Sequence, residues 1–172
     1  MRFRLAMIVG AVALGVSCFS SASAQIVPSP LGLLVRAGIF KPTSGTGSAV
    51  GSDWFTAGVE MDLFRLRLAG IDPIGGRITL SIDTYSRSGA SSIPVLLNFS
   101  AKSDQLKYSF GAGVSIAKRP GFDTVTRFAY QFSLGYELPI PGVPILAEAR
   151  FFGVSGMATA LDGIALTLGI RL

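Results

Sequence analysis

The feature that most constrains this chain is a strict alternation of apolar with small or polar residues over Leu106–Leu138. Every second residue is apolar or small from Leu106 to Ile116, and after a break at 118–123 the alternation resumes from Phe128 to Leu138. Because successive side chains of a β-strand point to opposite faces, this pattern predicts two long strands. The short polar break between them predicts an antiparallel hairpin.

The chemistry of the two faces narrows the fold further. One face is apolar and aromatic, whereas the other carries Gly, Ala and Ser with an occasional charge such as Lys107 or Glu137. A sheet face in water would carry Lys, Glu and Thr rather than repeated glycines. Small residues suit the inside of a narrow closed barrel, and a continuous apolar face suits lipid. We therefore expect a membrane β-barrel whose aromatic face points outward.

The composition agrees with this expectation. Hydrophobic residues make up 49% of the chain, charged residues only 15%, and the mean hydropathy is +0.55. Beyond the N-terminus there is no apolar run of the ~20 residues that a membrane helix needs. The hydrophobicity is instead spread over alternating positions, as a membrane barrel requires.

Residues 1–24 have the features of a secretory signal peptide. Arg2 and Arg4 form a basic start, Leu5–Val16 an apolar core, and Ala22-Ser23-Ala24 a cleavage site before Gln25. We expect the mature domain to span 25–172. Cleavage would leave 13 basic and 10 acidic residues, which are scattered rather than clustered and so do not indicate a nucleic-acid partner.

The single cysteine, Cys18, lies inside this leader, and histidine is absent. A lipoprotein signal ending at Cys18 is the alternative to plain cleavage, since Gly15-Val16-Ser17 precedes it, but the usual leucine three positions ahead is missing. The mature chain would have no thiol, no disulfide and no His/Cys metal site, and we expect no cofactor.

The same alternation predicts eight strands, each near the ~9–11 residues that a tilted strand needs to cross a bilayer. They are about Leu33–Phe40, Trp54–Leu68, Arg77–Tyr85, Ser92–Ala101, Leu106–Ile116, Phe128–Leu138, Pro144–Val154 and Gly163–Leu172. The alternation slips at Leu63-Phe64, which predicts a bulge or the start of the turn. An even number of strands places both termini on the periplasmic side and the first loop, Lys41–Asp53, outside. The predicted fold is all-β: a transmembrane eight-stranded antiparallel up-and-down β-barrel preceded by a cleaved signal peptide.

From Leu33 to Leu172 the chain resembles the small eight-stranded outer-membrane barrels of the OmpA/OmpX type. The segments that carry the resemblance are Ile93-Pro94-Val95, Phe110-Gly111-Ala112-Gly113-Val114, Leu134-Gly135-Tyr136-Glu137-Leu138 and Leu168-Gly169-Ile170-Arg171-Leu172. The chain departs from the pattern at Leu172, where such barrels usually carry the Phe or Trp that the assembly machinery reads. The resemblance implies the bacterial outer membrane as the location and the barrel-assembly machinery as a partner during biogenesis.

The main candidate site consists of charged residues at the strand positions that face inward, which we call positions of inward parity. They are Arg36, Glu60, Asp62, Arg77, Asp83, Lys107, Arg127, Glu137, Glu148, Arg150 and Arg171. Strand direction places Arg36, Glu60, Glu148 and Arg150 near mid-height, and Arg77, Lys107, Glu137 and Arg171 near the periplasmic mouth. Because unpaired charges in a narrow lumen are costly, we expect them to pair and plug the barrel, in preference to lining a polar pathway or ligand site.

A second set of residues predicts an aromatic girdle at the two membrane interfaces, facing lipid. It comprises Trp54, Phe55, Phe128, Tyr130 and Phe151 near the outer rim and Tyr108 and Tyr136 near the inner rim. A sugar- or lipid-recognition platform is the alternative role. The loop Lys118–Val125, with Lys118, Arg119 and Phe122, is either a solvated turn or a contact for anionic lipopolysaccharide.

Catalysis is not expected. Barrel-embedded lipid acyltransferases and deacylases use Ser with His as the base, and this chain has no histidine. Nor does any inward Ser have the spacing to an Asp or Glu that would let a carboxylate serve as the base. The sequence predicts a monomeric outer-membrane barrel with a plugged polar lumen and a structural or surface-interaction role through its loops. Two alternatives remain: a narrow pore or small-ligand transporter, and a soluble secreted lipocalin-like barrel with the aromatic residues inside.

Overall fold

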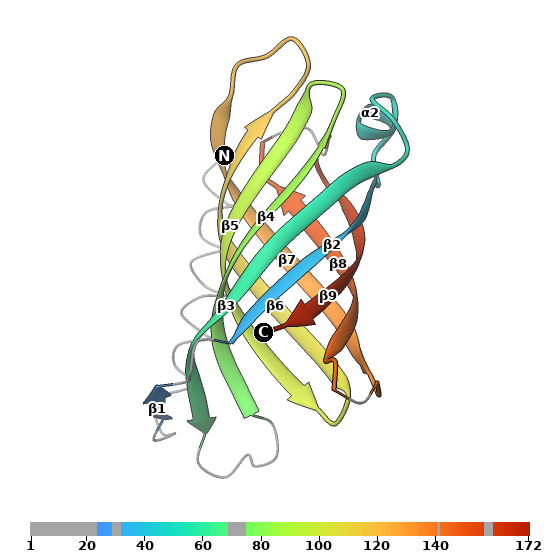
Figure 1. Ribbon diagram of the computed structural model, residues 1–172. Coiled ribbons are helices and arrows are strands. Elements are labelled where there is room, and N and C mark those ends of the chain that lie inside the picture. Colours follow the sequence, from blue (N-terminus) through green and yellow to red (C-terminus); the bar gives the residue numbers. More distant parts are fainter. Residues whose placement is uncertain (1–23, 29–31, 69–74, 141, 157–159) are drawn as a thin grey trace.

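The computed structural model describes residues 24–28, 32–68, 75–140, 142–156 and 160–172. Its elements are β1 (Ala24–Pro28), β2 (Leu33–Pro42), α2 (Gly45–Ser48), β3 (Trp54–Leu68), β4 (Gly75–Arg87), β5 (Ala90–Ser103), β6 (Leu106–Lys118), β7 (Val125–Leu138), β8 (Ile145–Val154) and β9 (Gly163–Arg171). Figure 1 shows that the long strands are tilted around a common axis. Apart from Ala24, the predicted signal peptide lies outside the described residues.

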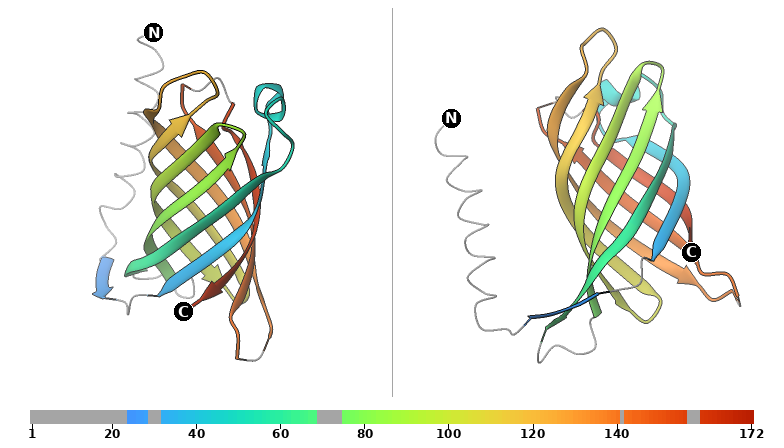
Figure 2. Two further views of the ribbon diagram at one scale, coloured as in Figure 1. Left: turned by 45° about the horizontal axis from the view of Figure 1, so that its top comes forward. Right: turned by 60° about the vertical axis from the view of Figure 1, so that its left-hand side comes forward.

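Strands β2 to β9 form a closed antiparallel barrel. Each pairs with its neighbours along the chain, and β2 pairs with β9 from Leu34↔Arg171 to Pro42↔Gly163, which closes the sheet. Within the described residues the barrel therefore has eight strands in up-and-down order, as predicted. Closure leaves no open edge along the barrel (Figure 2).

The central hairpin has the predicted alternation. Strand β6 pairs with β7 from Leu106↔Tyr136 to Ala117↔Val125, and Phe110 lies opposite Phe132. Phe132 is 58% exposed, whereas its neighbour Ser133 is 8% exposed. The apolar face of the hairpin thus points away from the barrel axis, and the small polar face points inward.

The predicted irregularity in the second long strand is a β-bulge. The β3–β4 register shifts between Asp62 and Phe64, at the point where the sequence alternation slips. A bulge inserts one extra residue, so the alternation of faces is reset beyond it. Asp62, directly before the bulge, keeps the inward parity of Glu60 and is buried, whereas beyond the bulge it is Arg65 that lies opposite Arg77.

The two ends of the barrel differ. The connections after β2, β4, β6 and β8 lie at one end, here called the loop end. The connections after β5 and β7 and the C-terminal Leu172 lie at the other, here called the turn end. The first loop is the longest, as predicted, but the β4–β5 connection is a tight turn at Ser88-Gly89. Both residues have positive φ, 48° and 86°, as in the type I′ turns that suit β-hairpins.

Two short elements were not predicted. β1 pairs with Phe64–Leu68 of β3, beyond the point where β2 begins opposite Met61. It covers backbone groups of β3 that would otherwise lie on an open edge. Cleavage before Gln25 would leave most of β1 on the mature chain. The other element is the one-turn helix α2, in which the side chain of Ser44 accepts a hydrogen bond from Gly47 N.

Among the described residues, no helix is both long and apolar enough to cross a membrane.

The close pairing of β2 with β9 leaves no room for a side chain at Gly38, and this can be tested. A Cβ on Gly38 would meet the carbonyl oxygen of Leu166 and lie 2.8 Å from the Cα of Thr167, both on the backbone of β9. Gly38→Ala is expected to lower the free energy of unfolding by about 1–3 kcal/mol, because the strands must separate. Denaturant unfolding measures this.

The matched control is Gly45→Ala, since a Cβ on Gly45 has nothing within 4 Å. Equal unfolding midpoints for the two variants would contradict the observed pairing of β2 with β9.

Candidate functional site

The middle of the barrel interior holds a cluster of paired charges centred on Arg36. Its Nε and Nη2 donate to the two carboxylate oxygens of Asp83, each at 2.9 Å. Its Nη1 donates to Oε2 of Glu60 at 2.8 Å. Inward parity on β2, β3 and β4 brings these side chains together, and each is at most 2% exposed. The two-point contact with Asp83 fixes the plane of the guanidinium.

Arg150 and Lys107 complete this cluster from β8 and β6. Nη1 of Arg150 donates to Oδ1 of Asp83 at 2.6 Å, and Nζ of Lys107 donates to Oε1 of Glu60 at 2.8 Å. Glu148 lies between the cations. Its Oε2 is 3.5 Å from Nε of Arg150 and 3.8 Å from Nη1 of Arg36, and its Oε1 is 3.7 Å from Nζ of Lys107. We call these six residues (Arg36, Glu60, Asp83, Lys107, Glu148 and Arg150) the central cluster. Three cations face three carboxylates, so the central cluster is formally neutral.

Amides and hydroxyls surround the central cluster. Gln131 accepts from Nη2 of Arg150 and donates to Asn98, which donates to Ser81 at 3.1 Å. Ser133 donates to Glu148 at 2.9 Å. Glu148 Oε2 and Arg150 Nε, 3.5 Å apart, are two buried atoms for which the described residues provide no hydrogen-bond partner. The polar side chains fill the lumen and hold one another in place.

A separate group of charges lies at the turn end. Asp62 accepts from Nη1 of Arg77 at 2.6 Å and lies 3.3 Å from Nη1 of Arg171. Lys102, which the sequence analysis did not include, pairs with Glu137. These five residues line a cavity of about 180 Å³, together with Ser100, Ala101 and, from the central cluster, Glu60 and Lys107. We call this cavity the mouth cavity.

Arg127 is not part of the interior network, contrary to the prediction. It has inward parity on β7 and lies opposite Ser115 of β6, but its side chain is exposed. The pairing of β7 with β8 begins only at Ala129↔Val154. Arg127 therefore projects beyond the point where the lumen is enclosed on both sides.

The loop-end half of the interior is aromatic rather than polar. The rings of Phe40 and Tyr85 stack with centroids 4.1 Å apart, and those of Trp54 and Phe152 lie 5.5 Å from Phe40 and Tyr85 respectively. The hydroxyl of Tyr85 donates to the carbonyl of Leu161 at 2.9 Å. These five residues, each at most 1% exposed, form what we call the aromatic plug.

The placement of Trp54 corrects the predicted girdle. Trp54 is 1% exposed and its Nε1 donates to the carbonyl of Gly51 at 2.8 Å, so it fills the interior instead of facing outward. The reason is strand parity, because Trp54 alternates with Phe55 and shares a face with Thr56. The same parity places Phe40, Tyr85 and Phe152 on the inward face, and it is the sequence signal for an aromatic part of the interior.

The other aromatic residues of the predicted girdle point outward. Phe55, Phe128 and Tyr136 are exposed, whereas Tyr108, Tyr130 and Phe151 are half-buried among their neighbours on the outer surface. The rings of Phe128, Tyr130, Phe132 and Phe151 form a contiguous outer patch, with centroids 6.2–6.4 Å apart.

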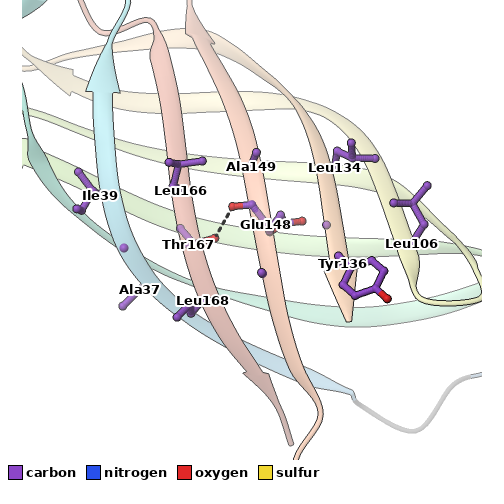
Figure 3. Close-up of a pocket in the computed structure, with 13 residues that line it drawn as sticks. Ala37, Ile39, Leu106, Leu134, Tyr136, Glu148, Ala149, Leu166, Thr167 and Leu168 are labelled. Carbon is purple, nitrogen blue, oxygen red and sulfur yellow. Dashed lines mark hydrogen bonds between the residues drawn. The ribbon is translucent and has the colours of Figure 1, made fainter. Parts of the chain in front are cut away.

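A shallow apolar hollow of about 550 Å³ lies on the outer surface beside this patch. Figure 3 shows Ala149 of β8 between larger side chains of β7 and β9, including Leu134 and Leu166. Ala147 also lines it, so the hollow exists because β8 carries alanines where neighbouring strands carry larger residues. It opens away from the barrel and is separated from the interior by the sheet.

Local contacts order the loops at the loop end. Nζ of Lys41 lies 3.3 Å from Oδ1 of Asp53, and the hydroxyl of Ser52 donates to Oδ2 at 2.9 Å. The Ser52 hydrogen bond and the Lys41 ammonium lower the pKa of the Asp53 carboxyl below its ordinary value. In the next long loop the guanidinium of Arg119 lies 4.8 Å from the ring centroid of Phe122, a side chain that is 62% exposed.

The described residues contain no group of three or more His, Cys, Asp or Glu side chains that could hold a metal ion. Comparison of the sequence with protein-family models and with curated proteins finds no match.

The central cluster makes a sharp prediction for Arg36. Arg36→Met removes one of the two cations that contact Asp83 and one of the two that contact Glu60. Because both carboxylates are buried, the substitution is expected to lower the free energy of unfolding by about 3–5 kcal/mol. Urea unfolding measures the change. Lys41→Met, which removes an exposed cation paired with Asp53, is the matched control and is expected to have little effect. Similar midpoints for the two variants would refute a stabilising role for the central pairing.

Proposed function

We propose that this protein is an integral outer-membrane β-barrel, exported by its N-terminal signal peptide and related in architecture to the OmpA/OmpX-type barrels. Its proposed role is structural, or one of surface interaction through its loops, with an interior that is plugged. The observation that carries the proposal is the inversion of the barrel. Charges are buried in its interior, while large apolar side chains cover its outside.

The outer apolar surface extends around the barrel. The large apolar side chains exposed on the barrel strands are Val35, Ile39, Phe55, Val59, Ile82, Ile93, Leu97, Leu106, Phe110, Val114, Ile116, Phe128, Phe132, Leu134, Tyr136, Ile164, Leu166, Leu168 and Ile170. Single exposed apolar residues are ordinary, but a contiguous apolar surface of this extent indicates an apolar partner. A lipid bilayer matches a surface that encircles the molecule. We call this set the outer belt.

The barrel also meets the hydrogen-bonding demand of a membrane. Hydrocarbon offers no partner for backbone N–H and C=O groups, so a strand can cross only within a closed sheet. The β2–β9 pairing provides that closure. The barrel strands are 9 to 15 residues long, which meets the ~9–11 that a tilted crossing needs.

The side chains that fill the interior favour a plugged barrel, rather than a pore or a lipocalin-like carrier. A pore needs a continuous aqueous path, but the aromatic plug and the central cluster lie one above the other in the lumen. A lipocalin-like carrier needs an apolar cavity lined by the hairpin aromatics. Phe110, Phe128 and Phe132 instead lie outside, each more than half exposed.

The charge of the loop end supports surface interaction with anionic lipopolysaccharide. Among the described residues its cations are Lys41, Arg87, Lys118, Arg119 and Arg127, and its carboxylates are Asp53, Asp123 and Asp162. The excess of cations suits phosphate groups, and Phe122 beside Arg119 adds an exposed apolar contact. We further propose that the barrel is inserted by the barrel-assembly machinery and acts as a monomer.

Phe132→Asp and Phe122→Asp form a matched pair that tests the membrane assignment. The two side chains are 58% and 62% exposed, but one lies in the outer belt and the other in a loop. Phe132→Asp is expected to reduce insertion, because it places a carboxylate against hydrocarbon, whereas Phe122→Asp is expected to be tolerated. The readout is the amount of detergent-resistant, heat-modifiable protein in outer-membrane fractions.

For the unmodified full chain, we expect a band in that fraction whose migration changes on boiling. Folded protein in the soluble fraction without detergent, or equal tolerance of both substitutions, would overturn the proposal.

The fluorescence of Trp54, the single tryptophan, can test the inner and the outer face of the barrel separately. In vesicles with brominated acyl chains, its emission is expected to be weakly quenched, because it is buried in the aromatic plug. The double variant Trp54→Phe/Phe55→Trp moves the indole to an outward position and is expected to be strongly quenched. Strong quenching of the unmodified protein would contradict the interior placement, and absence of quenching in the double variant would contradict the bilayer assignment.

A further inference from the structure

We propose that the mouth cavity is a binding site for a small oxyanion, one with two or more acceptor oxygens on a single atom, such as a phosphate or a carboxylate group. The cavity, of about 180 Å³, is large enough for a group of this size. This proposal depends on the barrel and its interior, and not on the lipid surroundings of the outer belt.

The charges that line the mouth cavity favour an anion. Four lining residues are cationic, namely Arg77, Lys102, Lys107 and Arg171, and three are acidic, namely Glu60, Asp62 and Glu137. The central cluster, by contrast, has equal numbers of cations and carboxylates and leaves no charge for a ligand to balance. The mouth cavity therefore has the excess positive charge that the middle of the lumen lacks.

The excess arises at Asp62. This one carboxylate, with its side chain 4% exposed, is shared by Arg77 and Arg171, whose side chains are 30% and 25% exposed. Among the described residues both guanidiniums contact Asp62 through Nη1 alone. Their other N–H groups remain to donate to a ligand, and a planar guanidinium is well suited to two-point contact with an oxyanion.

A second, independent observation comes from Ser100. It lines the same cavity and is 4% exposed, and within the described residues its hydroxyl has no hydrogen-bond partner. A buried hydroxyl without a partner costs free energy, so such groups are normally satisfied. A change of the Ser100 χ1 rotamer that turns the hydroxyl toward a bound oxyanion would provide an acceptor for it.

The arrangement argues against a cation as the ligand. Each of the three carboxylates that line the cavity already contacts a cationic side chain: Glu60 contacts Lys107, Asp62 contacts Arg77, and Glu137 contacts Lys102. A cation would have to displace these partners. An oxyanion instead adds to donors that are already present.

Isothermal titration calorimetry of the full chain, folded in a detergent without phosphate, tests the site with inorganic phosphate as the probe. Saturable binding is expected for the unmodified protein. Arg77→Gln and Arg171→Gln are each expected to weaken it about tenfold or more, the loss of one charge-assisted hydrogen bond. Asp62→Asn is expected to strengthen binding, because it removes the carboxylate that competes for both guanidiniums.

The matched control is Arg87→Gln, which makes the same change of charge at the loop end, where Arg87 contacts the backbone of Asp53. It is expected to alter phosphate affinity less than about twofold, while heat-modifiability of every variant confirms folding. Absence of saturable binding, equal weakening by Arg87→Gln, or weakening by Asp62→Asn would each overturn the proposal. The opposite sign expected for Asp62→Asn keeps the test decisive if an arginine variant does not fold.

Competition identifies the source of the oxyanion. Loss of phosphate binding on adding short-chain phosphatidylglycerol supports a lipid headgroup as the ligand. Undiminished phosphate binding in its presence supports a soluble anion. Since the titration is done in detergent, failure of the membrane assignment and failure of the oxyanion site are separately visible.

Discussion

The pairing of β2 with β9 turns a sheet into a barrel, and the rest of the molecule follows from that closure. A closed sheet satisfies its backbone hydrogen bonds internally, which is the condition a sheet must meet to lie in an apolar medium. The same closure confines the inner side chains to a narrow space that they must fill themselves. Glycines permit close approach of the strands, as Gly38 does where β2 meets the backbone of Leu166 and Thr167.

The narrow interior is filled in two different ways. Near the loop end, stacked rings exclude water without any charge. In the middle, each charge is compensated by its neighbours, with Asp83 held by two arginines and Glu60 by Arg36 and Lys107. Buried ion pairs add little net stability, because desolvation offsets their attraction, but loss of one partner is costly. A substitution that removes one charge of the central cluster would therefore leave its partner buried and uncompensated, so few other side chains fit at these positions.

Alternation predicts most of this fold from the sequence, because a period of two specifies which side of the sheet each residue occupies. It predicts the closed barrel and, at Leu63-Phe64, either a bulge or the start of the turn, of which the structure has the bulge. It did not reveal that Trp54 closes the lumen, because a tryptophan at a strand end is typical of an interfacial girdle, whereas its parity with Thr56 places it inside. Nor did it place Arg127, since parity does not show where neighbouring strands end. Which cation meets which carboxylate depends on strand stagger, which a single sequence does not specify.

The two ends of the lumen have unequal access to solvent. Phe40, Trp54 and Tyr85 are almost completely buried at one end, whereas Arg77 and Arg171 are partly exposed at the other. The central cluster is thus easier to reach from the turn end than from the loop end. The mouth cavity, which Glu60 and Lys107 of the central cluster also line, is the part of the interior that the surrounding medium can enter. At the loop end the same medium meets the loops and the buried rings of the aromatic plug.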